Sequence, residues 1–242
     1  MYGFKRESGR ILVLALAATA FAASSAAAQQ QRAQQQATPQ TPNDDLRLAT
    51  ELGFEYKLSP QWHLRLDTKL TLDHDISRAR TLEVRPGVGY ALTPNWAVAT
   101  GYVQYQPYTT QIRATRGPFE DIAYGMNFGR LSLANRLRTE ELFFDNNGAL
   151  LIRTRYRLSA QHQIGASPWG ILVSDEIFFN LKTDGTTRPA GYDRNEFYGG
   201  IVREIGRGTK ISAGYQFTAL QPRGGGRNEF HTIKLGFAFA LN

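Results

Sequence analysis

The chain has 242 residues, no cysteine and a formal net charge of +7. The absence of cysteine excludes disulfide staples, thiolate chemistry and a lipoprotein anchor, which needs a cysteine at its cleavage point. The positive excess is modest and spread along the chain. It suits anionic lipid or an acidic solute but does not by itself indicate nucleic-acid binding.

The first 28 residues have the pattern of a secretory signal peptide. A basic start that includes Lys5 and Arg10 precedes an apolar run at 11–23 and a small-residue end at Ala28, the expected cleavage point. The apolar run is shorter than the about 20 residues of a membrane-spanning helix, which disfavours the alternative of an N-terminal membrane anchor. We therefore predict a cleaved signal peptide at 1–28 and export into the periplasm.

Two further segments follow the leader. Residues 29–45 are rich in Gln and Pro without apolar periodicity, which predicts a disordered lead-in. From 46 to 242, turn signals recur every ten to fifteen residues or so, the spacing typical of membrane-barrel strands. We predict a single barrel domain at 46–242.

The strongest pattern in this domain is an alternation of apolar and polar residues. In 46–58 the leucines and aromatic residues occupy one parity, and charged residues such as Arg47 and Glu51 occupy the other. The segment 62–72 repeats this pattern. Because alternate side chains of a strand point to opposite faces, each segment has one apolar and one ionic face. The dense ionic face behind a secretory leader favours a barrel with lipid outside and charge inside, with a soluble periplasmic β-sandwich as the alternative.

The predicted strands are joined by tight turns that alternate with longer polar loops, as in outer-membrane barrels. We predict an all-β, transmembrane, antiparallel up-and-down β-barrel of about 10–12 strands. Bacterial single-chain barrels have even strand numbers, so ten or twelve strands are expected and twelve is favoured. The segments with strand character are 46–58, 62–73, 81–92, 96–107, 119–128, 131–144, 150–161, 169–181, 194–205, 209–220 and 228–241.

Aromatic residues and the last strand support an address in the outer membrane of a Gram-negative bacterium. Trp62, Trp96 and Trp169 each begin a predicted strand just after a tight turn, as in an interfacial aromatic girdle. The segment 231–242 alternates apolar residues with Lys, Gly and Ala, as the closing strands of such barrels do, although it ends Leu-Asn. We expect outer-membrane lipid and the barrel-assembly machinery as partners.

Two neighbouring strands concentrate charge on the inward parity. Like charges on adjacent strands repel, so these arginines need carboxylates from elsewhere in the barrel. Two interpretations stay open: the lumen is a packed ionic plug of Arg–carboxylate pairs, or surplus positive charge lines a passage for a small anionic solute. The predicted lumen-lining cluster consists of Arg136, Arg138, Glu140, Arg153, Arg155, Arg157, Glu176, Arg194, Glu196, Glu83 and Arg85.

Several of these segments resemble the DUF2490 family, a bacterial outer-membrane β-barrel family of unknown function. The similarity spans roughly 46–242 and is strongest over 131–242. It implies a barrel fold and an outer-membrane address but no activity, and Asp175 departs from the asparagine expected there. The segments that carry the resemblance are Asn135–Glu140, Arg153–Leu158, Asp175–Asn180, Asp193–Glu196 and Gly214–Phe217.

Residues suited to catalysis are sparse. His63, His162 and His231 are scattered, and neither a GxSxG nor an HExxH motif occurs. His74, between Asp73 and Asp75, is the only local cluster that suggests a metal site or a dyad, and a run of solvated loop charges is the favoured interpretation. We predict no catalytic residues, metal or cofactor.

The sequence therefore predicts a non-enzymatic outer-membrane barrel, either structural or a narrow, porin-like, anion-favouring pore with an Arg-rich lumen. The alternatives are an outer-membrane barrel enzyme acting on lipid or peptide, or the soluble periplasmic sandwich. Nucleic acid is not expected as a partner, because the basic residues lie on strand interiors.

Overall fold

The computed structural model describes residues 46–108, 113–145, 148–182, 190–206, 208–221 and 227–241. The predicted signal peptide at 1–28 and lead-in at 29–45 lie outside the described residues and stay predictions. Among the described residues no helix is long and apolar enough to cross a membrane.

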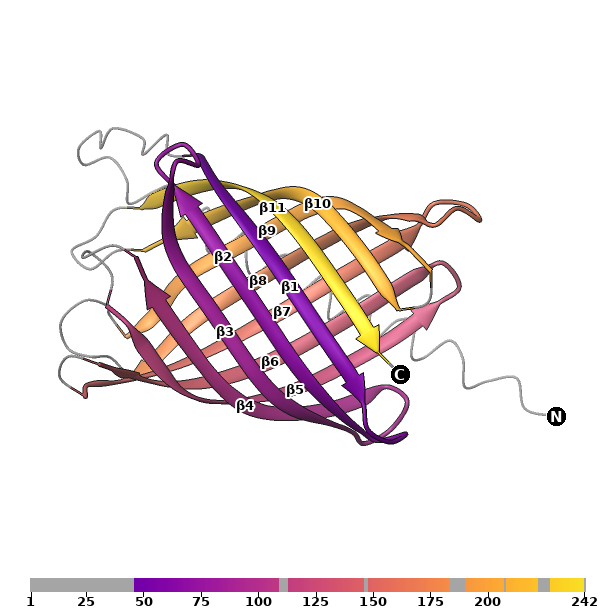
Figure 1. Ribbon diagram of the computed structural model, residues 1–242, viewed down its shortest axis with the longest axis horizontal. Coiled ribbons are helices and arrows are strands. Elements are labelled where there is room, and N and C mark those ends of the chain that lie inside the picture. The colour runs from indigo at the N-terminus through magenta and orange to yellow at the C-terminus, as the bar shows by residue number, and fades with distance from the viewer. Residues whose placement is uncertain are drawn as a thin grey trace. The chain divides into compact units, whose positions relative to one another are not determined.

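The described residues form one closed sheet of eleven strands (Figure 1). The all-β barrel fold is thereby confirmed, and the alternative of two stacked sheets in a sandwich is wrong. The strands are β1 (Leu46–Lys57), β2 (Trp62–Asp73), β3 (Arg78–Ala91), β4 (Trp96–Pro107), β5 (Thr115–Phe128), β6 (Leu131–Phe144), β7 (Leu150–Gln163), β8 (Trp169–Lys182), β9 (Gly191–Glu204), β10 (Thr209–Leu220) and β11 (Asn228–Leu241).

The eleven strands among the described residues agree with the predicted number of about 10–12, but the expectation of an even number is wrong. Each strand pairs antiparallel with the next, so with an odd number the first and last strands run in the same direction. The barrel accordingly closes through a parallel ladder between β1 and β11, in register from Leu46 opposite His231 to Tyr56 opposite Leu241. The two arrows lie side by side and point the same way in Figure 1.

The two ends of the barrel differ. The connections after β1, β3, β5, β7 and β9 lie at one end, which we call the turn end, together with the end of β11. There the hydroxyl of Ser59 accepts a hydrogen bond from the backbone N–H of Trp62, and the hydroxyl of Thr93 accepts one from the backbone N–H of Trp96, each at 3.0 Å. The remaining connections and the start of β1 lie at the opposite, loop end.

Three strands, β3, β5 and β9, begin earlier than the sequence predicts, and β5 shows the largest difference. β5 starts at Thr115 rather than at residue 119, and Pro118 lies inside it. Pro118 is paired with Tyr102 of β4, whereas the ladder to β6 is interrupted at this position. A proline is tolerated where one side of the strand needs no N–H donor, so it did not end the strand.

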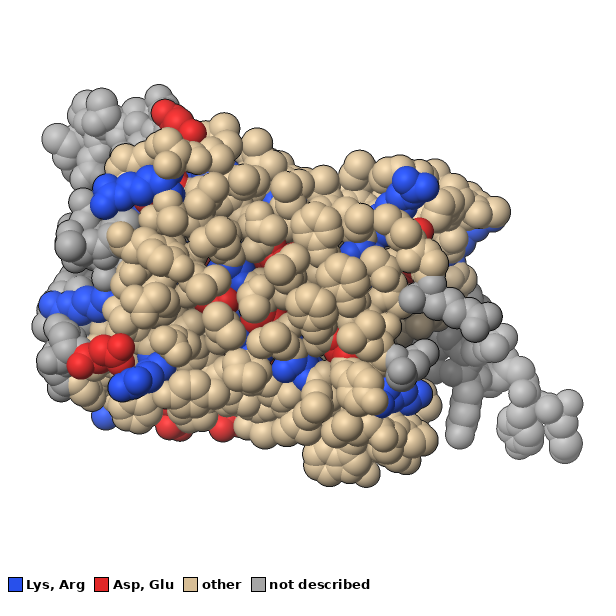
Figure 2. Space-filling view, in the orientation of Figure 1, with Lys and Arg blue, Asp and Glu red and all other residues tan. Residues whose placement is uncertain are grey.

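Side-chain exposure fixes which face of the sheet points outward. Leu52, Leu66 and Leu137 are 36%, 38% and 43% exposed, whereas Arg138 on the other parity is 1% exposed. Figure 2 shows a largely uncharged surface over the strands, with charged side chains most prominent toward the two ends. Leucine side chains are thus exposed on the outer face of the sheet, and Arg138 is buried on the inner face.

The interior changes character from end to end. Toward the loop end, Val103, Phe119, Leu142, Phe144 and Leu151 form a buried apolar cluster inside the barrel. Toward the turn end the inward positions carry small side chains, which leave the lumen wider. These positions include Gly53, Gly89, Ala99, Ala123, Gly125, Ala134, Ser159, Ser174, Gly200, Ser212, Gly214, Gly236 and Ala238.

The parallel closure can be tested with cysteine pairs, because the natural chain has none. Thr50 and Leu235 are directly opposite across β1 and β11. We expect Thr50→Cys combined with Leu235→Cys to form an intramolecular disulfide on oxidation, read by gel mobility and mass spectrometry. Thr50→Cys combined with Phe239→Cys, four residues further along β11, is the matched control and should stay reduced. Crosslinking in the control alone would contradict the register.

Candidate binding site in the barrel lumen

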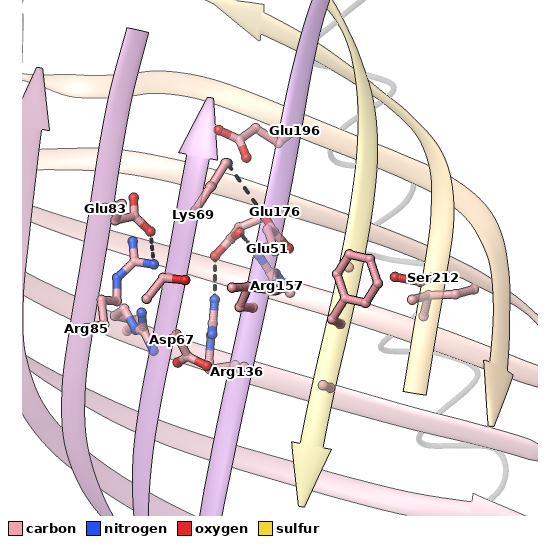
Figure 3. A pocket seen from close by; sticks show the side chains of 18 of the residues that line it. Glu51, Asp67, Lys69, Glu83, Arg85, Arg136, Arg157, Glu176, Glu196 and Ser212 are labelled. Carbon is pink, nitrogen blue, oxygen red and sulfur yellow. Dashed lines mark hydrogen bonds and ion pairs between the residues drawn. The ribbon is translucent and has the colours of Figure 1, made fainter. Parts of the chain in front are cut away.

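The candidate site is a cavity of about 390 Å³ inside the barrel (Figure 3). It extends toward the turn end, since its lining includes the small residues Ser212, Gly236 and Ala238. Its wall carries more basic than acidic side chains. The basic residues are Arg65, Lys69, Arg85, Arg136, Arg138, Arg155, Arg157, Arg194 and Lys210, and the acidic residues are Glu51, Asp67, Glu83, Glu176 and Glu196.

The structure brings the residues of the predicted cluster together in the lumen. Two of them, Glu140 and Arg153, do not line the cavity and are almost completely buried. The others, Arg136, Arg138, Arg155, Arg157, Glu176, Arg194, Glu196, Glu83 and Arg85, all contribute to the cavity lining.

The register of β6 and β7 creates an electrostatic problem. It places Arg136 opposite Arg157 and Arg138 opposite Arg155. Like charges directly across a ladder repel, and in a barrel interior water screens this repulsion poorly. The arrangement is stable only if carboxylates from other strands reach between the guanidinium groups.

Glu176 of β8 is one such carboxylate. Its Oε2 lies 2.5 Å from Arg157 Nη2, and its Oε1 lies 2.9 Å from Arg136 Nη2. Arg155 Nε is 3.4 Å from the same Oε1. Glu176 therefore bridges the opposed pair and contacts a third arginine while its own side chain is only 3% exposed. Figure 3 shows Arg136 reaching Glu176 across the floor of the cavity.

Glu140 of β6 has the equivalent role nearer the loop end. Arg153 Nη2 lies 2.5 Å from Glu140 Oε2, and Arg155 and Arg85 approach Oε1 to 3.4 and 3.6 Å. The Tyr105 hydroxyl accepts from Arg153 and Arg85 at 2.8 Å each. This phenol joins the two arginines and also lies 3.4 Å from both carboxylate oxygens of Glu140.

Asp121 of β5 is an essential partner that the sequence reasoning missed. Arg138 Nη2 donates to its Oδ2 at 2.5 Å, and Arg138 Nε donates to Oδ1, so the pair is bidentate. Arg65 Nη1 lies 3.5 Å from the same carboxylate. The alternation of Phe119, Asp121 and Ala123 in the predicted strand carried the signal, because that parity points inward.

A second group of ion pairs lies on the opposite side of the lumen and was also missed. Glu51 of β1 lies 2.9 Å from Lys234 Nζ and 3.8 Å from Lys69 Nζ. One carboxylate again serves two cations, this time across the β1–β11 closure. Figure 3 shows Lys69, Glu51 and Arg157 around the same cavity. The Glu51 ion pairs and the Glu176 ion pairs therefore both line it.

The remaining predicted residues form local pairs. Glu83 contacts Arg85, and Glu196 contacts Arg194 at 2.7 Å. Arg194 also contacts Asp193 at 2.6 Å, and its guanidinium carbon lies 3.6 Å from the ring centroid of Phe178. The Phe178 ring therefore packs against the guanidinium group of Arg194 at the loop side of the cavity.

One comparison with known proteins gives a match. A family model described as "Protein of unknown function (DUF2490)" matches residues 49–229. The chain belongs to this family. A search of curated proteins finds no match. The match runs from β1 into β11, so the DUF2490 region is the barrel itself.

The four histidines of this DUF2490 barrel lie on separate elements, with His63 on β2, His74 in the β2–β3 turn, His162 on β7 and His231 on β11. Among the described segments there is no group of three or more His, Asp or Glu side chains suited to a metal ion. At the predicted His74 cluster, Asp73 is buried and lies 3.0 Å from His74 Nδ1 and 2.6 Å from Arg80 Nη1. Asp73 therefore ties the β2–β3 turn to the barrel wall, which is a structural role.

The Asp121–Arg138 pair gives a direct test of the buried network. We expect Asp121→Asn to lower the free energy of unfolding by about 3–5 kcal/mol, because it leaves Arg138 buried without a counter-charge. Adding Arg138→Met should restore much of the loss, since the double variant buries no unpaired charge. Denaturant unfolding of the refolded protein measures both. A double variant less stable than Asp121→Asn would show that Arg138 does not depend on Asp121.

Proposed function

We propose that the protein is a non-enzymatic β-barrel of the outer membrane of a Gram-negative bacterium, with a lumen closed by ion pairs. Its partners are outer-membrane lipid and the barrel-assembly machinery. The observation that carries the proposal is the pairing of the inward arginines of β6 and β7, each of which contacts a carboxylate.

Support for the membrane comes from the outer surface. Large apolar side chains are exposed over much of it, including Leu64 at 46% and Ile201 at 50%. So wide an exposed apolar surface is unfavourable in water. At the turn end, Trp62 packs edge-on against Tyr90 and Trp96 against Tyr124, with ring centroids 4.8 and 4.6 Å apart. A band of aromatic pairs at the rim of an apolar belt is typical of outer-membrane barrels.

Support for a closed lumen comes from burial. Arg138, Arg153 and Arg155 are at most 6% exposed, and the apolar cluster around Phe119 and Leu142 lies on the loop side of them. A water-filled channel would leave such charged groups hydrated. The paired layer is better described as a plug, to which the guanidinium forks contribute bidentate geometry.

A second candidate function, a narrow anion-favouring passage, rests on one observation. The cavity lining carries nine basic against five acidic side chains. Arg157 and Arg136 keep 34% and 19% of their side chains exposed, so part of this positive charge faces the cavity. A small anion is the candidate solute. No observation favours an enzyme acting on lipid or peptide in the same way.

The membrane proposal predicts opposite outcomes for two arginines placed on opposite faces of the sheet. Leu66 of β2 points outward at mid-strand, and Ala134 of β6 points into the wide half of the lumen. Leu66→Arg should lower barrel stability in lipid by about 2–4 kcal/mol and impair assembly, because a charge then faces hydrocarbon. Ala134→Arg should be nearly neutral. Heat-modifiable gel mobility of membrane fractions reports both, and equal effects would argue against a lipid-facing exterior.

Plug and passage are separated by removing one charge from each side of the network. If the lumen is a plug, Glu176→Gln should cost about 3–5 kcal/mol, because it removes the buried carboxylate that three inward-pointing arginines share. Arg155→Gln should cost less, since Glu140 and Glu176 each keep two other arginines. If the lumen is a wet passage, both variants should keep wild-type stability.

Planar-bilayer recordings complete the test. A plug predicts no conductance for the wild-type protein, whereas a passage predicts anion selectivity that Arg155→Gln lowers, measured as reversal potential. Wild-type stability in both variants together with unchanged selectivity would contradict both functions.

A further inference from the structure

The lipid-facing side of the barrel is not uniformly apolar. Asp175 of β8 is paired with Leu158 of β7 and Phe197 of β9, both of which face outward, so its carboxylate lies on the outer surface. Its Oδ1 accepts a hydrogen bond from Asn195 Nδ2 at 2.7 Å. Among the described residues, the ion pairs of the lumen do not include Asp175, because they lie on the opposite face of the sheet.

Asp175 lies near the middle of the wall rather than at a rim. It lies six positions along β8 from Trp169, which is at the turn end. That is about 20 Å along the strand. With the tilt usual for such barrels, the depth is about 15 Å below the aromatic rim, near the centre of the apolar belt. An acidic group at this depth is costly in lipid and is by default a candidate for function.

A second acid stands at a corresponding depth three strands away. Glu120 of β5 is exposed on the outer face and lies between Thr100 of β4 and Thr139 of β6. Thr139 Oγ1 lies 3.4 Å from Thr154 Oγ1 of β7. Hydroxyl groups thus continue the polar surface from Glu120 toward Asp175.

Further polar side chains lie between the two acids, beside the apolar residues Leu137 and Ile177. The Tyr156 hydroxyl of β7 donates to Asn135 Oδ1 of β6 at 2.5 Å. Asn135 retains its amide N–H groups as donors. We call the set Glu120, Asn135, Thr139, Thr154, Tyr156, Asp175 and Asn195 the outer polar patch.

The opposite wall has no counterpart to this patch. Outward positions of β1 and β2 between the rims carry leucine, phenylalanine and threonine, for example Leu52, Phe54 and Leu66. In Figure 1 the β6–β8 wall lies behind the β1–β3 wall. One side of the barrel is therefore suited to lipid, whereas the other presents acceptors and donors at mid-depth.

We infer that the outer polar patch is the contact surface for a second copy of this chain within the membrane. Lipid tails cannot hydrogen-bond to these groups, so the covering surface must itself be polar at the same depth. The patch offers both carboxylate acceptors and amide or hydroxyl donors. Two copies inserted in the same orientation place the patch at matching depth in both, as closed symmetric assemblies require. The inference rests on the proposed outer-membrane function.

Single-cysteine crosslinking tests the contact, because the natural chain contains no cysteine. Leu137→Cys and Ile177→Cys place a thiol within the outer polar patch, and Leu66→Cys on β2 is the matched control on the opposite wall. After oxidation of outer-membrane fractions with copper phenanthroline, at least one patch variant should give a disulfide dimer on non-reducing gels, and the control should stay monomeric. Sedimentation of the wild-type protein in density-matched detergent should give twice the monomer mass.

A second variant tests whether the polar groups carry the contact. Asp175→Leu combined with Glu120→Leu should reduce patch crosslinking at least tenfold with heat-modifiable mobility unchanged, whereas Thr68→Leu on β2 should have no effect. Undiminished crosslinking in the double variant would overturn the role of the patch. A monomeric mass with no patch crosslink, or equal crosslinking of Leu66→Cys, would overturn the contact itself. Absence of the wild-type protein from outer membranes would instead overturn the proposed function.

Discussion

A closed sheet encloses one of its two faces, and this barrel encloses the charged one. Charges brought into so small a volume have to be neutralised by one another, because little water can follow them. The shared carboxylates meet this requirement. Glu176 contacts three arginines, Glu140 contacts three arginines and a phenol, and Glu51 contacts two lysines. Each of these three acids lies on a different strand from most of its partners, so the network also ties the wall together across the lumen.

The alternating pattern made the strands and their faces predictable. The way in which the first and last strands pair to close the barrel was not predictable from it. Predicted and observed bounds agree for β2, β4, β6, β10 and β11, because period-two alternation and turn residues are local signals. Strand number is a global property, and an expectation of evenness obscured the eleven segments already visible in the sequence. Their odd number requires a parallel seam between β1 and β11, which no local signal announces.

The candidate site was predictable to the same degree. The arginines of β6 and β7 stand out because they repeat on one parity, and the structure brings them together. Asp121, Glu51 and Asp67 were missed because they lie on strands other than the two that concentrate arginine. Which acid reaches which arginine depends on register and on distance across the lumen. Asp121 meets Arg138 because β5 and β6 place them directly opposite each other.

The interior and exterior of the barrel solve the same problem in different ways. Inside, carboxylates and guanidinium groups neutralise one another within a single chain, and the small residues of the turn-end half leave a cavity beside them. Outside, no ion pair joins Asp175 or Glu120 to a basic side chain among the described residues. Asp175 lies between Leu158 and Phe197 and accepts a hydrogen bond from Asn195, and Glu120 lies between Thr100 and Thr139. The acids that line the lumen are therefore paired with basic side chains, whereas the two acids on the outer wall are not. That contrast favours association through the outer wall over transport through the inner one.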